Sequence, residues 1–318
     1  MKRAFVFPGQ GSQAVGMGRS LADGFPAARR LFDEVDDALS QPLSRLMFDG
    51  PESELTLTEN AQPALMAASL AVIRVLETEG GLDIARHVAF VAGHSLGEYS
   101  ALAAAGALAP GDAARLLKLR GRAMQRAVPV GAGAMAALIG LDAEAARLVA
   151  AEATRAGIEH DEICAVANDN APGQVVVSGH RGAVERAIAI ARGHGARRSV
   201  MLPVSAPFHS PLLIPAADAM AVALANVALR PPRAPLVANV TARPVKNPAE
   251  IKCLLVRQVT AMVRWRESVM FLAKAGVEEV VEIGAGRVLA GLVRRIAPAL
   301  ATRSVGAPAE VEALIGAL

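Results

Sequence analysis

Residues 88–108 place a short apolar run, the pentapeptide Gly93-His94-Ser95-Leu96-Gly97 and an alanine-rich stretch one after another. A G-x-S-x-G sequence between a strand and a helix is typical of a nucleophile elbow, a strained turn that exposes a serine hydroxyl at the end of a buried strand. Glycines suit the flanking positions because a Cβ atom there would clash with neighbouring backbone. We therefore predict that Ser95 is a nucleophile and that the Leu96 amide faces the oxyanion formed on an acyl carbonyl. The alternative is a glycine-rich loop that serves only as a turn.

Short apolar runs also begin near residues 4, 235 and 277, and helical patterns recur between such runs. Strands that alternate with helices predict a mostly parallel sheet with its ligand site at the carboxyl ends of the strands. Hydrophobic residues make up 53% of the 318-residue chain but aromatic residues only 3%, so the core has to be built from aliphatic side chains. We expect an α/β protein whose larger part is α/β-hydrolase-like.

Residues 129–203 read as β-α-β-β-α-β, with a hairpin turn in the sequence NDNAPGQ at 168–174. The order and size predict an inserted ferredoxin-like small subdomain. The flanking segments, 1–128 and 204–318, then form one discontinuous large catalytic subdomain. We expect the active site in the cleft between the two subdomains.

A serine nucleophile needs a general base, and His209 is the best placed of the six histidines, in a proline-rich turn after a strand-like run. His94 is adjacent to Ser95, but a residue beside the nucleophile points away from it at such a sharp turn, so we expect a structural or secondary polar role. The other histidines precede a strand or fall in polar stretches of the insertion: His87, His160, His180 and His194. No acid between Ser95 and His209 has an obvious orienting role, so an acidic residue and a backbone carbonyl both stay open for it.

The segment 112–127, which follows Pro110, reads as a helix with Asp112 as its N-cap. An apolar stripe at helical spacing consists of Leu116, Leu119, Arg120, Ala123 and Met124. Arg120 is the exception in this stripe, and its five N–H donors need a partner because an unpaired buried charge is too costly. An internal carboxylate would satisfy it, and so would a ligand carboxylate, which would select a dicarboxylic acyl group. The spacing leaves both possibilities open.

Two glutamines are further candidates for the site. Gln10 follows the first predicted strand in the sequence PGQGSQ, where its side chain can face the cleft and where no nucleotide-binding glycine motif is complete. Gln62 precedes a long alanine-rich helix, so capping of that helix is its alternative role.

Several functional classes are not expected from this sequence. The N-terminus lacks the apolar region of a signal peptide, and charged residues interrupt every apolar stretch, so we expect a cytoplasmic protein without a membrane span. The net charge of +3 comes from dispersed basic residues, which argues against a nucleic-acid partner. Cys164 and Cys253 provide neither a disulfide framework nor metal-ligand spacing, so no metal or redox cofactor is expected. A monomer is the default expectation.

Six short motifs, which together span nearly the whole chain, resemble those of malonyl-CoA:acyl carrier protein transacylases in order and spacing; they are residues 7–13, 58–63, 93–98, 119–122, 170–174 and 204–209. The resemblance implies a stand-alone enzyme that moves a malonyl group from malonyl-CoA to the phosphopantetheine thiol of acyl carrier protein. It implies ping-pong chemistry through an ester on serine, in the service of fatty acid biosynthesis.

The resemblance also assigns roles to the reacting groups. Ser95 would be the nucleophile, His209 its base and Arg120 the clamp on the malonyl carboxylate. Gln10 and the Leu96 amide would form the oxyanion hole.

Further roles that the resemblance implies concern the pocket and the histidine. A backbone carbonyl near Gln258 would orient the imidazole, and Gln62 would line the pocket. Asn168 would face the site, with Asn170 as the alternative. Phe208 resembles the bulky residue of malonyl-selective acyltransferases, which implies a preference for malonyl over methylmalonyl.

Three other functions remain open at this level. A serine hydrolase could use the same elbow, and the malonyl transferase component of malonate decarboxylase shares the motifs. A noncatalytic carrier-binding module would leave the elbow, base and clamp unexplained. For the acidic carrier we expect a basic rim at the cleft, with ordinary solvated charge as the alternative; it would contain Lys118, Arg122, Arg126, Arg192, Arg197 and Arg198.

Overall fold

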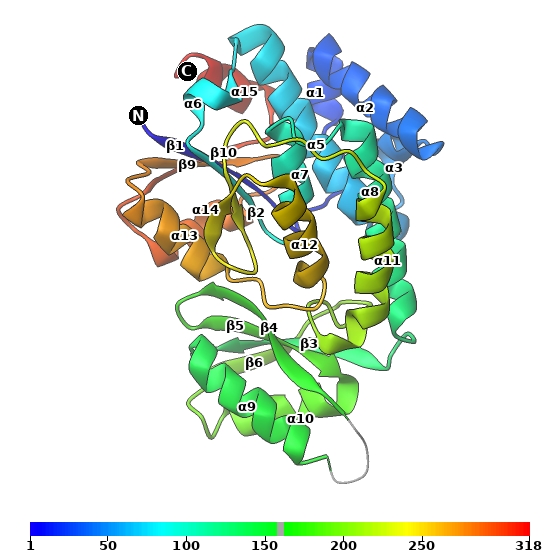
Figure 1. The fold of residues 1–318 in the computed structure, drawn as a ribbon, viewed down its shortest axis with the longest axis vertical. Helices are drawn as coiled ribbons and strands as arrows, with labels where there is room; N and C mark the ends of the chain where they lie inside the picture. Colours follow the sequence, from blue (N-terminus) through cyan, green and yellow to red (C-terminus); the bar gives the residue numbers. More distant parts are fainter. Residues whose placement is uncertain (158–161) are drawn as a thin grey trace.

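The computed structural model describes residues 1–157 and 162–318, and the chain folds into two lobes that Figure 1 shows one above the other. The upper lobe contains a six-stranded sheet with its helices, and the lower lobe a four-stranded sheet with two helices. This architecture confirms the predicted α/β class with a large and a small subdomain. The strands of the lower lobe lie between residues 133 and 201, inside the segment 129–203, whose precise ends stay a prediction.

The sheet of the large subdomain has the strand order β10-β9-β1-β2-β7-β8. Its strands are β1 (Arg3–Phe7), β2 (Phe90–Gly93), β7 (Leu236–Ala238), β8 (Arg243–Val245), β9 (Glu279–Ile283) and β10 (Ala301–Val305). All neighbours are parallel except β7 and β8. Because β1 and β2 pair in register up to Phe7 and Gly93, the turns behind them leave at the same edge of the sheet. Gln10 and Ser95 lie in these two turns, where α/β proteins bind ligands.

Helices cover both faces of this sheet, which explains why β1 is buried along its whole length. In chain order they are α1 (Arg19–Gly24), α2 (Pro26–Leu39), α3 (Leu43–Asp49), α4 (Glu52–Leu55), α5 (Thr58–Gly80), α6 (Ile84–His87), α7 (Gly97–Ala104), α8 (Pro110–Ala127), the 3-10 turn η1 (Pro211–Leu213), α11 (Ile214–Ala225), α12 (Pro248–Gln258), α13 (Trp265–Lys274), α14 (Val288–Ile296) and α15 (Pro308–Ile315). Phe5 and Phe7 pack into the core formed with α2, α5 and α8, while Ala4 and Val6 face α13 and α14.

Helix α8 begins three residues earlier than the cap prediction requires. Ala109 occupies the N-cap and Pro110 the first helical position, so the prediction of Asp112 as N-cap is wrong. Proline is favoured there because the N–H it lacks would be unpaired anyway. Leu119, predicted on the apolar stripe, is 39% exposed, whereas Arg120 on the same stripe is 1% exposed.

The small subdomain has the predicted β-α-β-β-α-β order and an antiparallel sheet arranged β4-β5-β3-β6. Its elements are β3 (Gly133–Ile139), α9 (Ala143–Arg155), β4 (Cys164–Ala171), β5 (Gln174–His180), α10 (Arg181–Ala191) and β6 (Arg198–Met201). Helices α9 and α10 pack on one face of this sheet (Figure 1). From the other face, Met135 and Val176 reach the cavity that contains Ser95.

The hairpin between β4 and β5 is tighter than predicted. Only Pro172 and Gly173 form the turn, and Gly173 has a φ of 69°. Asn168 and Asn170, expected in the turn, lie in strand β4 instead. The strand extends this far because it also pairs with a segment of the large subdomain.

That pairing is the junction between the subdomains. The Asp169 N–H donates to the Val263 carbonyl at 2.9 Å, and the Val263 N–H donates to the Ala167 carbonyl at 2.9 Å. The Asp169 carboxylate is 1% exposed and accepts from the Arg266 guanidinium at 2.8 Å. Strand β4 is therefore fixed to the start of α13 by backbone bonds and by a buried charge.

The described residues contain no helix with the length and apolar character needed to cross a membrane. They also contain no group of three or more His, Cys, Asp or Glu side chains arranged to hold a metal ion.

Replacement of Arg266 by Met should destabilise the protein by about 3 kcal/mol, because it leaves the buried Asp169 carboxylate without its partner. Unfolding in guanidinium chloride at neutral pH measures this loss. The matched control is Arg147→Met, which breaks an exposed pair with Glu144 and should change stability by less than about 0.5 kcal/mol. Equal small effects of both replacements would contradict the junction role of Arg266.

Candidate active site

The turn that holds Ser95 has no space for side chains at its two glycines. A Cβ atom on Gly93 would lie 1.9 Å from the Gly97 carbonyl carbon, and one on Gly97 would lie 2.3 Å from the Phe7 carbonyl oxygen. Ser95 itself has a φ of 54°, a left-handed conformation that is costly for a residue other than glycine. The strained, closely packed turn leaves Ser95 in the wall of a cavity, as the elbow motif predicts.

A buried asparagine, Asn239, stabilises the elbow through two side-chain hydrogen bonds. The Asn239 side chain accepts from the Ser95 N–H at 2.8 Å and donates to the Gly93 carbonyl at 2.7 Å. The Asn239 backbone N–H donates to the Glu98 carboxylate at 2.7 Å. Neither residue is among the predicted site residues, although each carries a signal in the sequence. Asn239 directly follows the apolar run of β7, and Glu98 lies among small and apolar residues after the elbow.

His209 contacts the nucleophile directly. Its Nε2 lies 2.8 Å from Ser95 Oγ, and its Nδ1 lies 2.8 Å from the Gln258 backbone carbonyl. Since a carbonyl only accepts, Nδ1 carries the proton and Nε2 is free to accept the proton of the serine hydroxyl. The structure thus places a backbone carbonyl, rather than an acid, against the imidazole.

Burial and the charge of Arg120 lower the pKa of His209 to about 3. His209 is therefore neutral at physiological pH, which is the form that a general base requires.

Arg120 is completely buried beside the same hydroxyl. Its Nη2 donates to Ser95 Oγ at 3.1 Å and to the Gln258 side-chain oxygen at 2.8 Å, and its Nη1 donates to the Gln62 side-chain oxygen at 2.8 Å. The Tyr99 ring covers the guanidinium, with its centroid 5.9 Å away. Within residues 1–157 and 162–318, Arg120 forms no ion pair with a carboxylate, and its Nε has no hydrogen-bond partner. An internal carboxylate therefore does not satisfy this charge directly.

The two predicted oxyanion donors both lie at the cavity but differ in how deeply they are buried. Leu96 is 1% exposed and directly precedes α7. Gln10 is exposed, and its Nε2 makes a long contact of 3.4 Å with Thr58 Oγ1. Both line the cavity of Ser95. Their role in binding an oxyanion stays a prediction.

The cavity has a volume of about 590 Å³ and lies between the two subdomains. Asn168, Asn170 and Phe208 all line it, so the two asparagines are not alternatives in this respect. His94 Nε2 lies 2.9 Å from Asn170 Oδ1, which gives His94 a polar partner other than Ser95. The effect of Phe208 on the choice of acyl group stays a prediction.

The remaining histidines in the described part of the chain have partners elsewhere. His87 accepts from the Asp83 N–H, His180 accepts from the Ile163 N–H, and His194 pairs with Glu152; the atoms are 2.9–3.0 Å apart. None of these three lines the Ser95 cavity. His160 lies outside the described residues.

Comparison with known proteins identifies the family. The acyl transferase domain family matches residues 4–317. The malonyl CoA-acyl carrier protein transacylase of Bacillus subtilis (strain 168) is 45% identical over 317 residues, which are 100% of this chain and 97% of that protein. The chain belongs to the malonyl CoA-acyl carrier protein transacylases.

Solved structures of this family match both subdomains. The acyl-carrier-protein-S-malonyltransferase from Bartonella henselae has a TM-score of 0.96 and 53% identity, covering 100% of this chain and 99% of that one. A malonyl-transacylase in complex with a type II PKS acyl-carrier protein has a TM-score of 0.94 and 42% identity, covering 100% of both chains.

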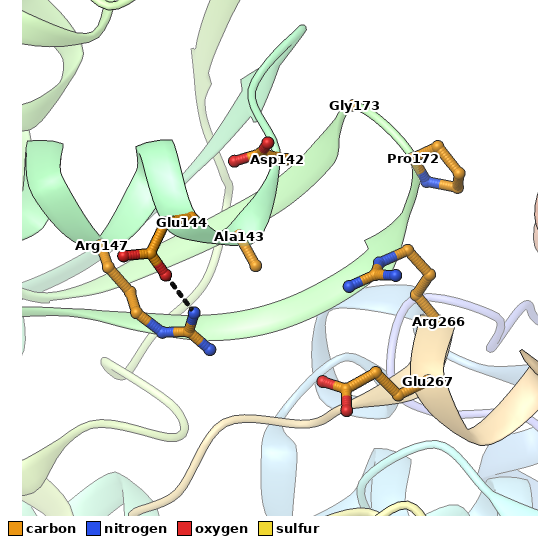
Figure 2. A pocket seen from close by; sticks show the side chains of 8 residues that line it. All are labelled: Asp142, Ala143, Glu144, Arg147, Pro172, Gly173, Arg266 and Glu267. Carbon is orange, nitrogen blue, oxygen red and sulfur yellow. Dashed lines mark hydrogen bonds and ion pairs between the residues drawn. The ribbon is translucent and has the colours of Figure 1, made fainter. Parts of the chain in front are cut away.

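A second cavity of about 400 Å³ lies between α9 and α13, away from the groups that this transacylase family member gathers around Ser95 (Figure 2). Its charged side chains have protein partners: Arg147 pairs with Glu144, and Arg266 with Asp169. Both arginines of this cavity are therefore paired within the protein, and the Ser95 cavity remains the candidate active site of the transacylase.

The predicted basic rim is partly neutralised. Lys118 and Arg122 both pair with Glu59, at 3.2 and 2.6 Å. Arg126 and Arg192 are exposed, as are Arg197 and Arg198. Docking of a carrier on this part of the transacylase stays a prediction.

Acidification should destabilise the protein through His209. Unfolded histidine takes up a proton below about pH 6.5, whereas buried His209 resists protonation down to about pH 3. The stability that neutral His209 contributes is present above about pH 6.5 and is lost as pH falls through this range. From about pH 7.5 to about pH 5, wild type should lose about 2 kcal/mol more than His209→Ala, as measured by chemical unfolding. Equal losses would mean that folded His209 is already protonated in this range.

Proposed function

We propose that this chain transfers a malonyl group from malonyl-CoA to the phosphopantetheine thiol of acyl carrier protein, through a malonyl ester on Ser95. The observation that carries the proposal is the convergence of two groups on one oxygen. Ser95 Oγ lies 2.8 Å from a neutral imidazole and 3.1 Å from a buried guanidinium. The first group supports nucleophilic attack, and the second supports selection of an acyl chain that ends in a carboxylate.

In the first half-reaction, His209 Nε2 accepts the proton of Ser95 Oγ while the oxygen forms a bond to the thioester carbonyl carbon. The negative charge on the carbonyl oxygen is met by the Leu96 N–H and the Gln10 side chain. When the intermediate collapses, the carbon–sulfur bond breaks and the sulfur of coenzyme A takes the proton from His209. The products are the malonyl ester of Ser95 and free coenzyme A.

The second half-reaction reverses these roles with a different thiol. The phosphopantetheine thiol gives its proton to His209 and its sulfur attacks the ester carbonyl carbon. The carbon–oxygen bond then breaks, and Ser95 Oγ takes the proton back from His209. Malonyl-carrier protein leaves with the enzyme restored, and no cofactor or metal is needed.

The surroundings of Arg120 support a dicarboxylic acyl group. Two neutral glutamine oxygens, from Gln62 and Gln258, satisfy part of its hydrogen bonding but not its charge. A malonyl ester carries its free carboxylate two bonds beyond the ester carbonyl carbon, close to the guanidinium beside Ser95. Binding there fixes the acyl group and leaves little room for a hydrolytic water.

The relatives support a carrier as the acceptor. The Bacillus subtilis relative is a malonyl CoA-acyl carrier protein transacylase, and a related malonyl-transacylase was solved in complex with an acyl-carrier protein. These relatives favour the transacylase over a serine hydrolase or the transferase component of malonate decarboxylase. We further propose that the protein is a monomer and that it acts in the cytoplasm. The two free cysteines, both in the described part of the chain, suit the reducing conditions of the cytoplasm.

Intact mass spectrometry after brief incubation with malonyl-CoA tests the covalent step. We expect a malonyl adduct on wild type and none on Ser95→Ala. Addition of phosphopantetheinylated acyl carrier protein should remove the adduct and produce malonyl-carrier. An adduct that is lost only to water would favour the hydrolase, and no adduct would contradict the proposed mechanism.

Replacement of Arg120 by Ala tests the clamp. Acylation of Ser95 by malonyl-CoA should fall at least about 100-fold more than acylation by acetyl-CoA, because only malonyl has a carboxylate to pair with the guanidinium. Single-turnover rates with the two thioesters give this ratio. Equal losses would remove Arg120 from the clamp role.

A further inference from the structure

Glu98 is a buried carboxylate that neither half-reaction uses. It lies in the first turn of α7 and is 1% exposed, and burial raises its pKa to about 7. Its Oε1 accepts from the Asn239 N–H at 2.7 Å, and its Oε2 accepts from Gln258 Nε2. Both partners in turn contact Ser95, so the carboxylate is linked to the nucleophile along two routes.

Both N–H donors and the carbonyl oxygen of the Gln258 side-chain amide have hydrogen-bond partners. Nε2 donates to the Ser95 backbone carbonyl at 2.8 Å and to Glu98, while Oε1 accepts from Arg120 Nη2 at 2.8 Å. An amide has two N–H donors on one side and a carbonyl oxygen on the other. If the amide turned over, its NH2 group would face the guanidinium and its oxygen would face two acceptors.

We infer that Glu98 is a positioning residue for the carboxylate clamp, because it holds the Gln258 amide with its carbonyl oxygen toward Arg120. An ionised carboxylate can only accept, so it admits only the NH2 side of the amide. The Gln258 oxygen then holds Arg120 Nη2 next to Ser95 Oγ. The inference rests on the proposed function, in which Arg120 binds the acyl carboxylate.

A positioning role and a counter-ion role for Glu98 predict opposite effects of its removal on the preference for malonyl. A carboxylate that neutralised Arg120 would compete with the acyl carboxylate, so its removal would favour malonyl. Glu98 instead reaches Arg120 through the neutral amide of Gln258. Removal of a positioning residue should therefore disfavour malonyl.

The variant Glu98→Gln distinguishes these two roles, because it removes the negative charge and leaves the side chain almost the same size. Its oxygen can still accept from the Asn239 N–H, which places its new NH2 group against Gln258 Nε2. Whichever way Gln258 then turns, two donors face each other, either at position 98 or at Arg120. We expect the ratio of malonyl to acetyl acylation of Ser95 to fall about tenfold, the size of one lost hydrogen bond to a charged group.

Single-turnover acylation at about pH 8, where Glu98 is ionised, gives this ratio for each variant. Gln258→Ala removes the amide but keeps the backbone carbonyl that orients His209. Added to Gln258→Ala, the change Glu98→Gln should cause no further fall in the ratio, because no amide remains to be held. If the two changes lower the malonyl to acetyl ratio independently, so that their effects multiply in the double variant, Glu98 acts by another route. That result would overturn the inference.

The matched control is Glu282→Gln, which alters another buried carboxylate. Glu282 is 0% exposed and accepts from the Leu289 and Ala290 N–H groups at the start of α14. This variant should lose stability without a change in the malonyl to acetyl ratio.

The outcomes separate the inference from the proposed function. If wild type forms no malonyl ester on Ser95, the proposed function fails. If wild type forms it and Glu98→Gln keeps or raises the malonyl to acetyl ratio, only the inference fails. A merely structural role would lower both acylation rates alike and leave the ratio unchanged.

Discussion

The buried guanidinium of Arg120 is the constraint on which the rest of this site depends. Burial of a charged side chain to 1% exposure costs several kcal/mol of folding free energy unless polar groups surround the charge. Here Gln62, Gln258 and Ser95 supply neutral oxygens, so the charge is solvated but not neutralised. The same charge adds to burial in lowering the pKa of His209, which keeps the base in its neutral form. In the proposed function, one arginine thus prepares the site for an anionic acyl group and for nucleophilic attack.

The two subdomains meet at the Ser95 cavity, where the proposed chemistry would take place. Residues 258–266 run from the carbonyl that orients His209, through the pairing of Val263 with β4, to the ion pair of Arg266 with Asp169. Strand β4 also carries Asn168 and Asn170 on the cavity wall. The orientation of His209 and the shape of the cavity therefore depend on one continuous segment. The ion pair of Arg266 with Asp169 fixes this segment to the small subdomain.

Sequence patterns found the elements that are buried and regular. The apolar runs of β1, β2, β7 and β9 were identified, since strands covered on both faces are apolar along their length. Strands β8 and β10 were not identified, because Arg243–Val245 and Ala301–Val305 lie at the edges of the sheet and contain exposed or polar residues. Local preference predicts a turn at the asparagines of the NDN sequence, but pairing with Val263 keeps them in β4.

The sequence by itself determined the elbow at Ser95 and the presence of a charge on the apolar face of α8. Both are local properties: close packing requires glycine at fixed spacing, and helical periodicity assigns Arg120 to a face. Only the tertiary structure decided which groups meet there. Gln258 donates to the carbonyl of Ser95 across 163 residues of chain, and Asn239 accepts from the amide of Ser95 across 144. Such pairings depend on how helices and strands pack, and no local pattern encodes them because each partner alone is an ordinary polar residue next to an apolar run.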